Sequence, residues 1–136
     1  MDLQPTTICE HVTADRPWLV SRHGLDTPLS ITLDIALFTP GEHYSPGHET
    51  QPRCCFTSGI PLGRVTATGL YGPWDPDACD GREVFAGVLL AEVHFAPGSR
   101  RAAGALHWHG VVAAAQLPCG FDPASVTRST AQIHFV

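Results

Sequence analysis

The sequence predicts a single, mainly β domain, and three observations support this fold class. Apolar and polar residues alternate over several short segments, which is the period of a half-buried strand. Proline and glycine together supply 25 of the 136 residues (12 Pro, 13 Gly), so turns are frequent and long helices are not expected. A chain of this length suits one domain with its own core rather than two domains.

The first 29 residues predict an extended N-terminal arm ahead of a β-rich domain at residues 30–136. No apolar period is sustained in this segment, and three prolines each remove a backbone donor from it: Pro5, Pro17 and Pro28. Such an arm gains order only from a neighbour. Within it, Thr6–Val12 has the composition of a short strand that forms where another sheet edge is offered.

Strand patterns recur through the domain. The clearest is the alternation of Ile31, Leu33, Ile35 and Leu37 with smaller or polar residues. Residues 62–70 also alternate, and residues 84–95 are apolar enough for a strand covered on both faces. The predicted strands cover residues 31–37, 62–70, 84–95, 106–109 with a continuation into 111–115, and 131–136.

Turn residues separate these strands. Residues 39–52 form a polar loop with two Pro-Gly pairs, and residues 69–82 place Gly, Pro and Asp at turn positions. Asp80-Gly81 is a strong tight-turn signal because Gly accepts positive φ and Asp bonds its own backbone. Asp122-Pro123 predicts the start of one short C-terminal helix of two turns, with Asp as N-cap and Pro at the first position.

Charge and composition exclude several functions. A formal net charge of −5 argues against nucleic-acid binding, which needs a basic face. All eight basic side chains are Arg, so neither Schiff-base lysine chemistry nor the lysine of a phosphate-binding loop is available. No Gly-x-Ser-x-Gly motif or comparable context frames a nucleophile. The chain is therefore not predicted to be an enzyme.

Cysteine usage and the chain's apolar runs indicate a protein made in a reducing compartment. The five cysteines are an odd number without a repeated spacing, which does not suit a disulfide framework. Residues 1–5 do not have the pattern of a signal peptide. The longest apolar run, at 84–91, is too short to span a bilayer, so no membrane partner is predicted.

Two metal hypotheses were weighed against simpler explanations. Cys9 with His11, and His107 with His109, each place two ligands on one face of a strand, and two such pairs would make a tetrahedral zinc site. However, no Cys-x-x-Cys occurs, and histidines that form hydrogen bonds or partner contacts explain the pattern better.

The acidic loop resembles a calcium loop only superficially. Its acids do not follow the EF-hand spacing, because Cys79 occupies the third ligand position and Glu83 comes too early. Asx-turns explain these acids at least as well. No metal or cofactor is predicted.

The Tyr71-Gly-Pro-Trp-Asp-Pro-Asp-Ala-Cys-Asp-Gly81 loop between two strands, followed by Ala86-Gly-Val-Leu-Leu90, resembles the lambda-type head decoration proteins of tailed phages. The resemblance continues through residues 104–136 and is weak before Ile31. It implies a β-tulip or β-clip domain that forms homotrimers on the outside of an icosahedral head. Such trimers sit at three-fold and quasi-three-fold positions, bind after the shell expands, and cement it against the pressure of packaged DNA.

The resemblance also implies the partners and the site residues. The partners are the major capsid protein and further copies of this chain, on a virion assembled from protein made in the cytoplasm of a host bacterium. The arm is expected to add a strand to an edge of the capsid protein through Thr6, Thr7, Ile8, Cys9, His11 and Val12. The trimer interface is expected to include Tyr71, Trp74, Asp75 and Pro76.

Two alternative functions remain at this stage. One is a receptor- or glycan-binding module on a virion, which an exposed aromatic platform would favour. The other is a trimeric β-clip enzyme such as a nucleotide hydrolase, although motifs for phosphate and base are not recognisable. Trp74 lies within a turn loop, where burial by its own strands is awkward, so burial against a neighbouring subunit is the hypothesis for this side chain.

Overall fold

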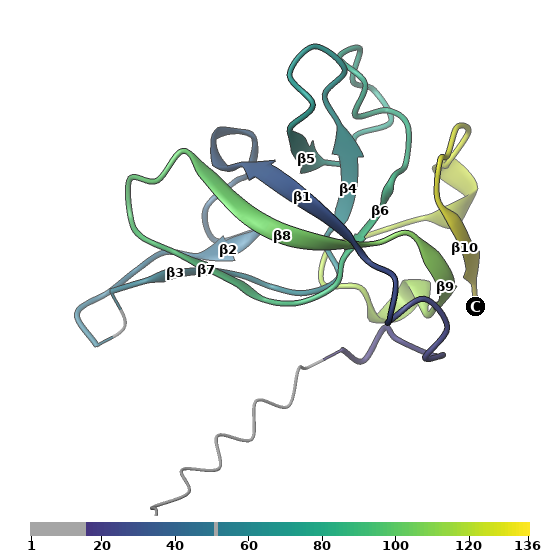
Figure 1. Ribbon diagram of the computed structural model, residues 1–136, viewed down its shortest axis with the longest axis horizontal. Coiled ribbons are helices and arrows are strands. Elements are labelled where there is room, and N and C mark those ends of the chain that lie inside the picture. Colours follow the sequence, from purple (N-terminus) through teal and green to yellow (C-terminus); the bar gives the residue numbers. More distant parts are fainter. Residues whose placement is uncertain (1–15, 51) are drawn as a thin grey trace, which may run out of the picture.

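A computed structural model describes residues 16–50 and 52–136, and it is mainly β (Figure 1). The predicted fold class is confirmed at this level, while the β-tulip or β-clip assignment stays a prediction. The strands are β1 Leu29–Asp34, β2 Tyr44–Ser45, β3 Cys54–Phe56, β4 Pro61–Arg64, β5 Tyr71–Pro73, β6 Gly87–Leu89, β7 Val93–Phe95, β8 Arg101–His107, β9 His109–Val112 and β10 Gln132–Phe135. Three 3-10 turns join them: η1 Ile35–Leu37, η2 Ala114–Gln116 and η3 Pro123–Ser125.

Five strands close into a barrel in the order β1-β5-β4-β6-β8. β1 pairs antiparallel with β8 over its whole length, from Leu29 opposite Leu106 to Asp34 opposite Arg101. β5 is parallel to β1 and antiparallel to β4. Closure leaves these strands without a free edge, which removes the usual route to edge-to-edge association.

Two smaller sheets flank the barrel (Figure 1). The antiparallel sheet β2-β3-β7 extends to one side, and the parallel pair β9-β10 lies at the other side with the C-terminus. β10 confirms the strand expected at residues 131–136.

The buried side chains form two clusters. The first, here called the barrel core, fills the barrel and the space under β2-β3-β7, with Leu33, Phe56, Ile60, Leu62 and Leu89 fully buried. The second, here called the terminal core, consists of Trp18, Phe85, Val88, Leu90, Val112 and Leu117. Side chains from both ends of the described chain therefore meet in one cluster.

Residues 16–29, part of the predicted arm, pack against the folded body. Trp18 is 1% exposed, and its Nε1 donates to Ser58 Oγ at 3.2 Å. Leu19 bridges to Val112 in β9. The expectation that this stretch gains order only from a neighbour does not hold here, because an indole this large is buried in the chain's own core. Residues 1–15, with the Thr6–Val12 strand, lie outside the described residues, and the arm stays a prediction.

The strand expected at 62–70 is a hairpin instead. β4 ends at Arg64, and the Val65 N–H donates to the Leu70 carbonyl at 2.8 Å before β5 begins. Gly69 has φ +72°, which suits glycine and turns the chain back. Val65 and Ala67 continue the alternation of apolar and polar residues through the turn, so periodicity alone predicts a strand where the chain reverses.

The other long strands are also shorter than expected. The strand expected at 31–37 ends at Asp34, whose side chain accepts from the Ala36 N–H and caps η1. Residues 84–95 divide into β6 and β7. Asp122 caps a helical turn as expected, with Pro123 at its start, but this is a single 3-10 turn rather than two turns. Among the described residues, no helix has the length and apolarity needed to cross a bilayer.

Candidate interaction surface

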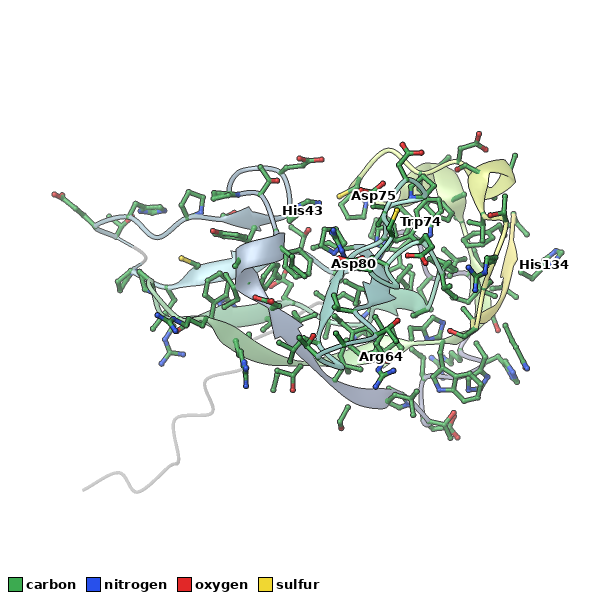
Figure 2. The ribbon with its side chains drawn as sticks, turned by 90° about the horizontal axis from the view of Figure 1, so that it is seen from above. His43, Arg64, Trp74, Asp75, Asp80 and His134 are labelled. Carbon is green, nitrogen blue, oxygen red and sulfur yellow. The ribbon has the colours of Figure 1, made fainter. Side chains whose placement is uncertain are left out.

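The loop expected at the trimer interface follows β5, and the pairing of this strand fixes where the loop begins. β5 is held on both sides, with Tyr71 opposite Leu33 of β1 and opposite Arg64 of β4. The Trp74 N–H then donates to the Pro61 carbonyl at 2.9 Å. The barrel therefore sets the direction in which residues 74–82, here called the Trp74 loop, leave the sheet (Figure 2).

Trp74 is half-buried against its own chain. Its ring packs edge-on against Phe121 and Phe85, with ring centroids 5.3 and 6.1 Å apart. Its Nε1 donates to the Glu83 carbonyl at 3.1 Å. Part of the Trp74 ring is therefore buried within its own subunit, because Phe121 of the C-terminal segment packs against it. The rest of the ring is accessible to solvent.

The acids of the Trp74 loop bond to the loop itself. Asp75 Oδ1 accepts from the Asp77 N–H at 3.0 Å, which is the expected Asx-turn. Arg82 Nε donates to Asp80 Oδ2 at 2.9 Å. Partial desolvation raises the pKa of Asp80, but the hydrogen bonds and charge of Arg82 outweigh it and hold the pKa below its ordinary value.

The end of the loop is hydrogen-bonded to the turn between β4 and β5. The Thr66 N–H donates to the Asp80 carbonyl at 2.9 Å, and Glu83 Oε2 accepts from the Gly81 N–H at 2.8 Å. Gly81 has φ +113°, and a Cβ there would collide with the Arg64 carbonyl. In the part of the chain that the structure describes, these acids do not converge into a group able to hold one ion. Hydrogen bonds within the loop and to its neighbours fix its course.

A groove of about 500 Å³ lies beside the Trp74 loop. Its lining residues come from four segments: Glu42 and His43 before β2, Ile60 and Pro61 around the start of β4, three residues of the Trp74 region (Pro73, Trp74 and Pro76), and a C-terminal stretch (Cys119, Gly120, Phe121, Asp122 and Ser125). Burial lowers the pKa of His43 more than Glu42 raises it, while burial and the Glu42 charge raise the pKa of the Cys119 thiol. The groove thus places two acidic side chains, Glu42 and Asp122, beside apolar walls.

The four residues expected at the trimer interface do not share one hollow. Trp74 and exposed Pro76 line the groove, Asp75 lines neither hollow, and Tyr71 lines a separate depression with Arg64. Sequence reasoning missed the contribution of His43 and of residues 119–125. No local motif marks them, because only the fold brings these segments beside residue 74.

His107 and His109, the histidine pair weighed as zinc ligands, lie in different environments. His109 uses both ring nitrogens, with Nε2 2.7 Å from Thr27 Oγ1 and Nδ1 3.1 Å from His23 Nε2. His107 is fully buried beside Trp18. Cys9 and His11 lie outside the described residues, so that pairing is not tested.

These features define a small, mainly β protein whose barrel carries a loop and a groove on its surface. A family model, bacteriophage lambda head decoration protein D, matches residues 51–133, which include the barrel strands from β4 onward, the Trp74 loop and most of the groove. The match covers more than half of the chain, and the chain belongs to this family. It is a structural protein associated with the phage capsid, in a family that is not one of enzymes. No curated protein and no solved structure gives a significant match.

Proposed function

We propose that this protein is a cement protein of a phage head. It binds the outer surface of the expanded shell as a homotrimer at three-fold and quasi-three-fold positions, and it stabilises the shell against the pressure of packaged DNA. The observation that carries this proposal is the family match over residues 51–133, the part of the chain that includes the Trp74 loop. A net charge of −5 suits a surface that does not contact the genome.

The trimer contact is proposed at the Trp74 loop and its groove. A half-buried tryptophan with exposed proline beside it forms the kind of preorganised aromatic anchor that interfaces use. The loop's internal hydrogen bonds mean that little conformational entropy is lost on association. In this arrangement the neighbouring subunit covers the exposed part of Trp74 and fills the groove.

Replacing Pro76 by arginine tests this contact. Pro76 is exposed, so Pro76→Arg should leave the unfolding transition of the free chain nearly unchanged while its bulk and charge disrupt a packed interface. Pro97→Arg is the matched control, an exposed proline in the turn between β7 and β8. We expect light scattering, with and without expanded heads, to show loss of trimers for Pro76→Arg only. Trimers unaffected by Pro76→Arg would remove the loop from the interface.

The capsid contact is proposed in the arm. Thr6–Val12 adds a strand to an exposed edge of the major capsid protein, where main-chain hydrogen bonds supply affinity. Three arms on one trimer act together, so effective concentration raises the avidity by ~10²–10⁴-fold over a single arm. Because only the expanded shell presents the complete site, binding stabilises that state by mass action.

Deleting residues 1–12 tests the arm, since the described body begins later, at Arg16. The shortened chain should keep the unfolding transition and the trimer of the full chain but lose occupancy on expanded heads. Unchanged occupancy would show that the arm does not bind the shell. For the function as a whole, heads that lack the protein should break at lower temperature than decorated heads. Equal heat resistance would refute the cement role.

A further inference from the structure

The sheet β2-β3-β7 gathers three metal-ligating side chains that the sequence motifs did not single out. Cys55 lies at the centre of β3, and its register partner in β7 is His94. Glu92 is two residues before His94 and so points to the same face. Cys55 Sγ lies 3.9 Å from both Glu92 Oε2 and His94 Nε2, and the three ligand atoms all lie within 4.8 Å of one another.

Buried residues on the opposite face of β3 and β7 fix the positions of these three side chains. Cys54 and Phe56, the neighbours of Cys55, are buried in the barrel core, and so is Phe95 beside His94. Their burial fixes the register of β3 on β7, because a slip by one residue would expose them. The opposite face of the same two strands therefore presents Cys55, Glu92 and His94 together to solvent.

From this arrangement we propose that Cys55, Glu92 and His94 form a binding site for Zn²⁺ or a similar borderline-soft divalent cation, with water as the fourth ligand. Zinc binds thiolate, imidazole and carboxylate at about 2.0–2.3 Å in tetrahedral geometry. Ligand atoms in such a site are about 3.3–3.7 Å apart, so small side-chain rotations bring the observed spacing to that of a loaded site. A thiolate with an imidazole disfavours Mg²⁺ and Ca²⁺, which prefer sites made only of oxygen.

Binding displaces one proton to the solvent. Zinc binds the thiolate rather than the thiol, so the Cys55 proton must leave when the metal binds. Zn²⁺ bonds to the sulfur as the S–H bond breaks, and the Glu92 charge that opposes thiolate formation in the free protein then faces the cation. Affinity should therefore rise with pH. A metal that binds only the folded chain also stabilises it by mass action.

Titration of the full chain with Zn²⁺, in a reductant that does not bind metal, tests the site. We expect one Zn²⁺ per chain by calorimetry, a rise in the unfolding temperature, and a thiolate-to-metal absorption band when Co²⁺ replaces Zn²⁺. Cys55→Ser should abolish that band. Cys55→Ser, Glu92→Gln and His94→Gln should each weaken Zn²⁺ binding at least about tenfold.

Matched controls are Cys79→Ser and His134→Gln, an exposed cysteine and an exposed histidine elsewhere on the chain. Both should bind Zn²⁺ like the unchanged chain. The three ligand positions are half- or fully exposed, so metal-free variants should unfold near the temperature of the unchanged chain. Zinc binding that survives Cys55→Ser, or the absence of one-to-one binding by the unchanged chain, would overturn the proposal. This test is independent of trimer formation and of capsid binding.

Discussion

The barrel core and the terminal core are assembled differently. The barrel core is formed mainly by strands whose register is set by continuous pairing, such as the six-residue pairing of β1 with β8. The terminal core joins Trp18 near one end of the described chain to Phe85, Val112 and side chains of the C-terminal segment, with loops rather than one sheet between them. The barrel core is enclosed by hydrogen-bonded strands. The terminal core forms where residues near both ends of the described chain pack together.

The buried histidine that packs against each core differs in its hydrogen bonding. His107, fully buried, lies against the terminal core with its ring 5.8 Å from that of Trp18. Within the described residues neither of its ring nitrogens has a hydrogen-bond partner, which is costly for a buried imidazole. The terminal core therefore packs against a buried imidazole without a described hydrogen-bond partner, whereas His43, which packs edge-on against Phe38 of the barrel core, accepts a hydrogen bond from the Thr39 N–H.

Removal of the Trp18 side chain should have the largest effect. Trp18→Ala leaves a cavity in the terminal core and removes the hydrogen bond to Ser58, at a cost of about 3–5 kcal/mol in the free energy of unfolding. Chemical denaturation measures this, with Val20→Ala, which truncates an exposed side chain, as the control. A loss below about 1 kcal/mol would mean that the terminal core is not part of the cooperative unit.

Gly59→Ala should have the next largest effect, because this glycine contacts the same indole. Gly59 has φ +88°, and an added Cβ would lie 2.5 Å from Trp18 Nε1. Backbone strain and the clash together should cost about 2–4 kcal/mol. Gly41 provides a matched control, since its φ is +84° but no heavy atom lies within 4 Å of an added Cβ.

Denaturation of both variants separates the two contributions. Gly41→Ala reports the backbone strain alone, about 1–2 kcal/mol. Equal losses for Gly41→Ala and Gly59→Ala would show that Trp18 moves aside without cost.

The sequence predicts local features of this fold better than its long-range contacts. The Asp80-Gly81 turn, the Asp122 cap and the strand at residues 131–136 follow from residue chemistry within a few positions. The hairpin at 65–70 was missed because Val65 and Ala67 continue a strand period while Gly69 alone marks the turn. Strand propensity and hydrophobic periodicity do not reveal a chain reversal that depends on a single glycine.

The candidate sites show the same limit. The sequence singled out the Trp74 loop from its turn residues, but the groove wall at residues 119–125 comes from a distant segment. Cys55 and His94 meet only because β3 pairs with β7. The docking of Trp18 depends on a hydrogen bond across 40 positions. Spacing in sequence carries no information about such pairs.

The pH dependence of stability should be smaller than the packing effects and should come largely from His107. Burial, and then the charges of His109, Arg16 and His23, lower the pKa of His107 below its ordinary value of 6.5. The unfolded chain then binds the proton more tightly than the folded chain, so stability is full above about pH 6.5 and falls as the pH is lowered. One proton gives a slope of about 1.4 kcal/mol per pH unit.

Denaturant midpoints measured from pH 8 to pH 5 test this slope. His107→Leu should reduce this slope. A smaller slope should remain from His43, because burial also lowers the pKa of that side chain. His134→Gln changes an exposed histidine and should leave the slope as it is. An unchanged slope in His107→Leu would place the pH sensitivity outside the terminal core.

The smallest effect is expected at the ion pair of the Trp74 loop, which lies outside both cores. Asp80→Asn removes the charge that faces Arg82 while keeping a side chain able to accept a hydrogen bond, and an exposed pair of this kind contributes at most about 1 kcal/mol. Because Arg82 holds the pKa of Asp80 low, any contribution is present at neutral pH and is lost only in acid. Salt should abolish the difference between Asp80→Asn and the unchanged chain, since exposed charges are screened. A loss well above this range that persists in high salt would mean that the loop is held by the barrel as firmly as either core.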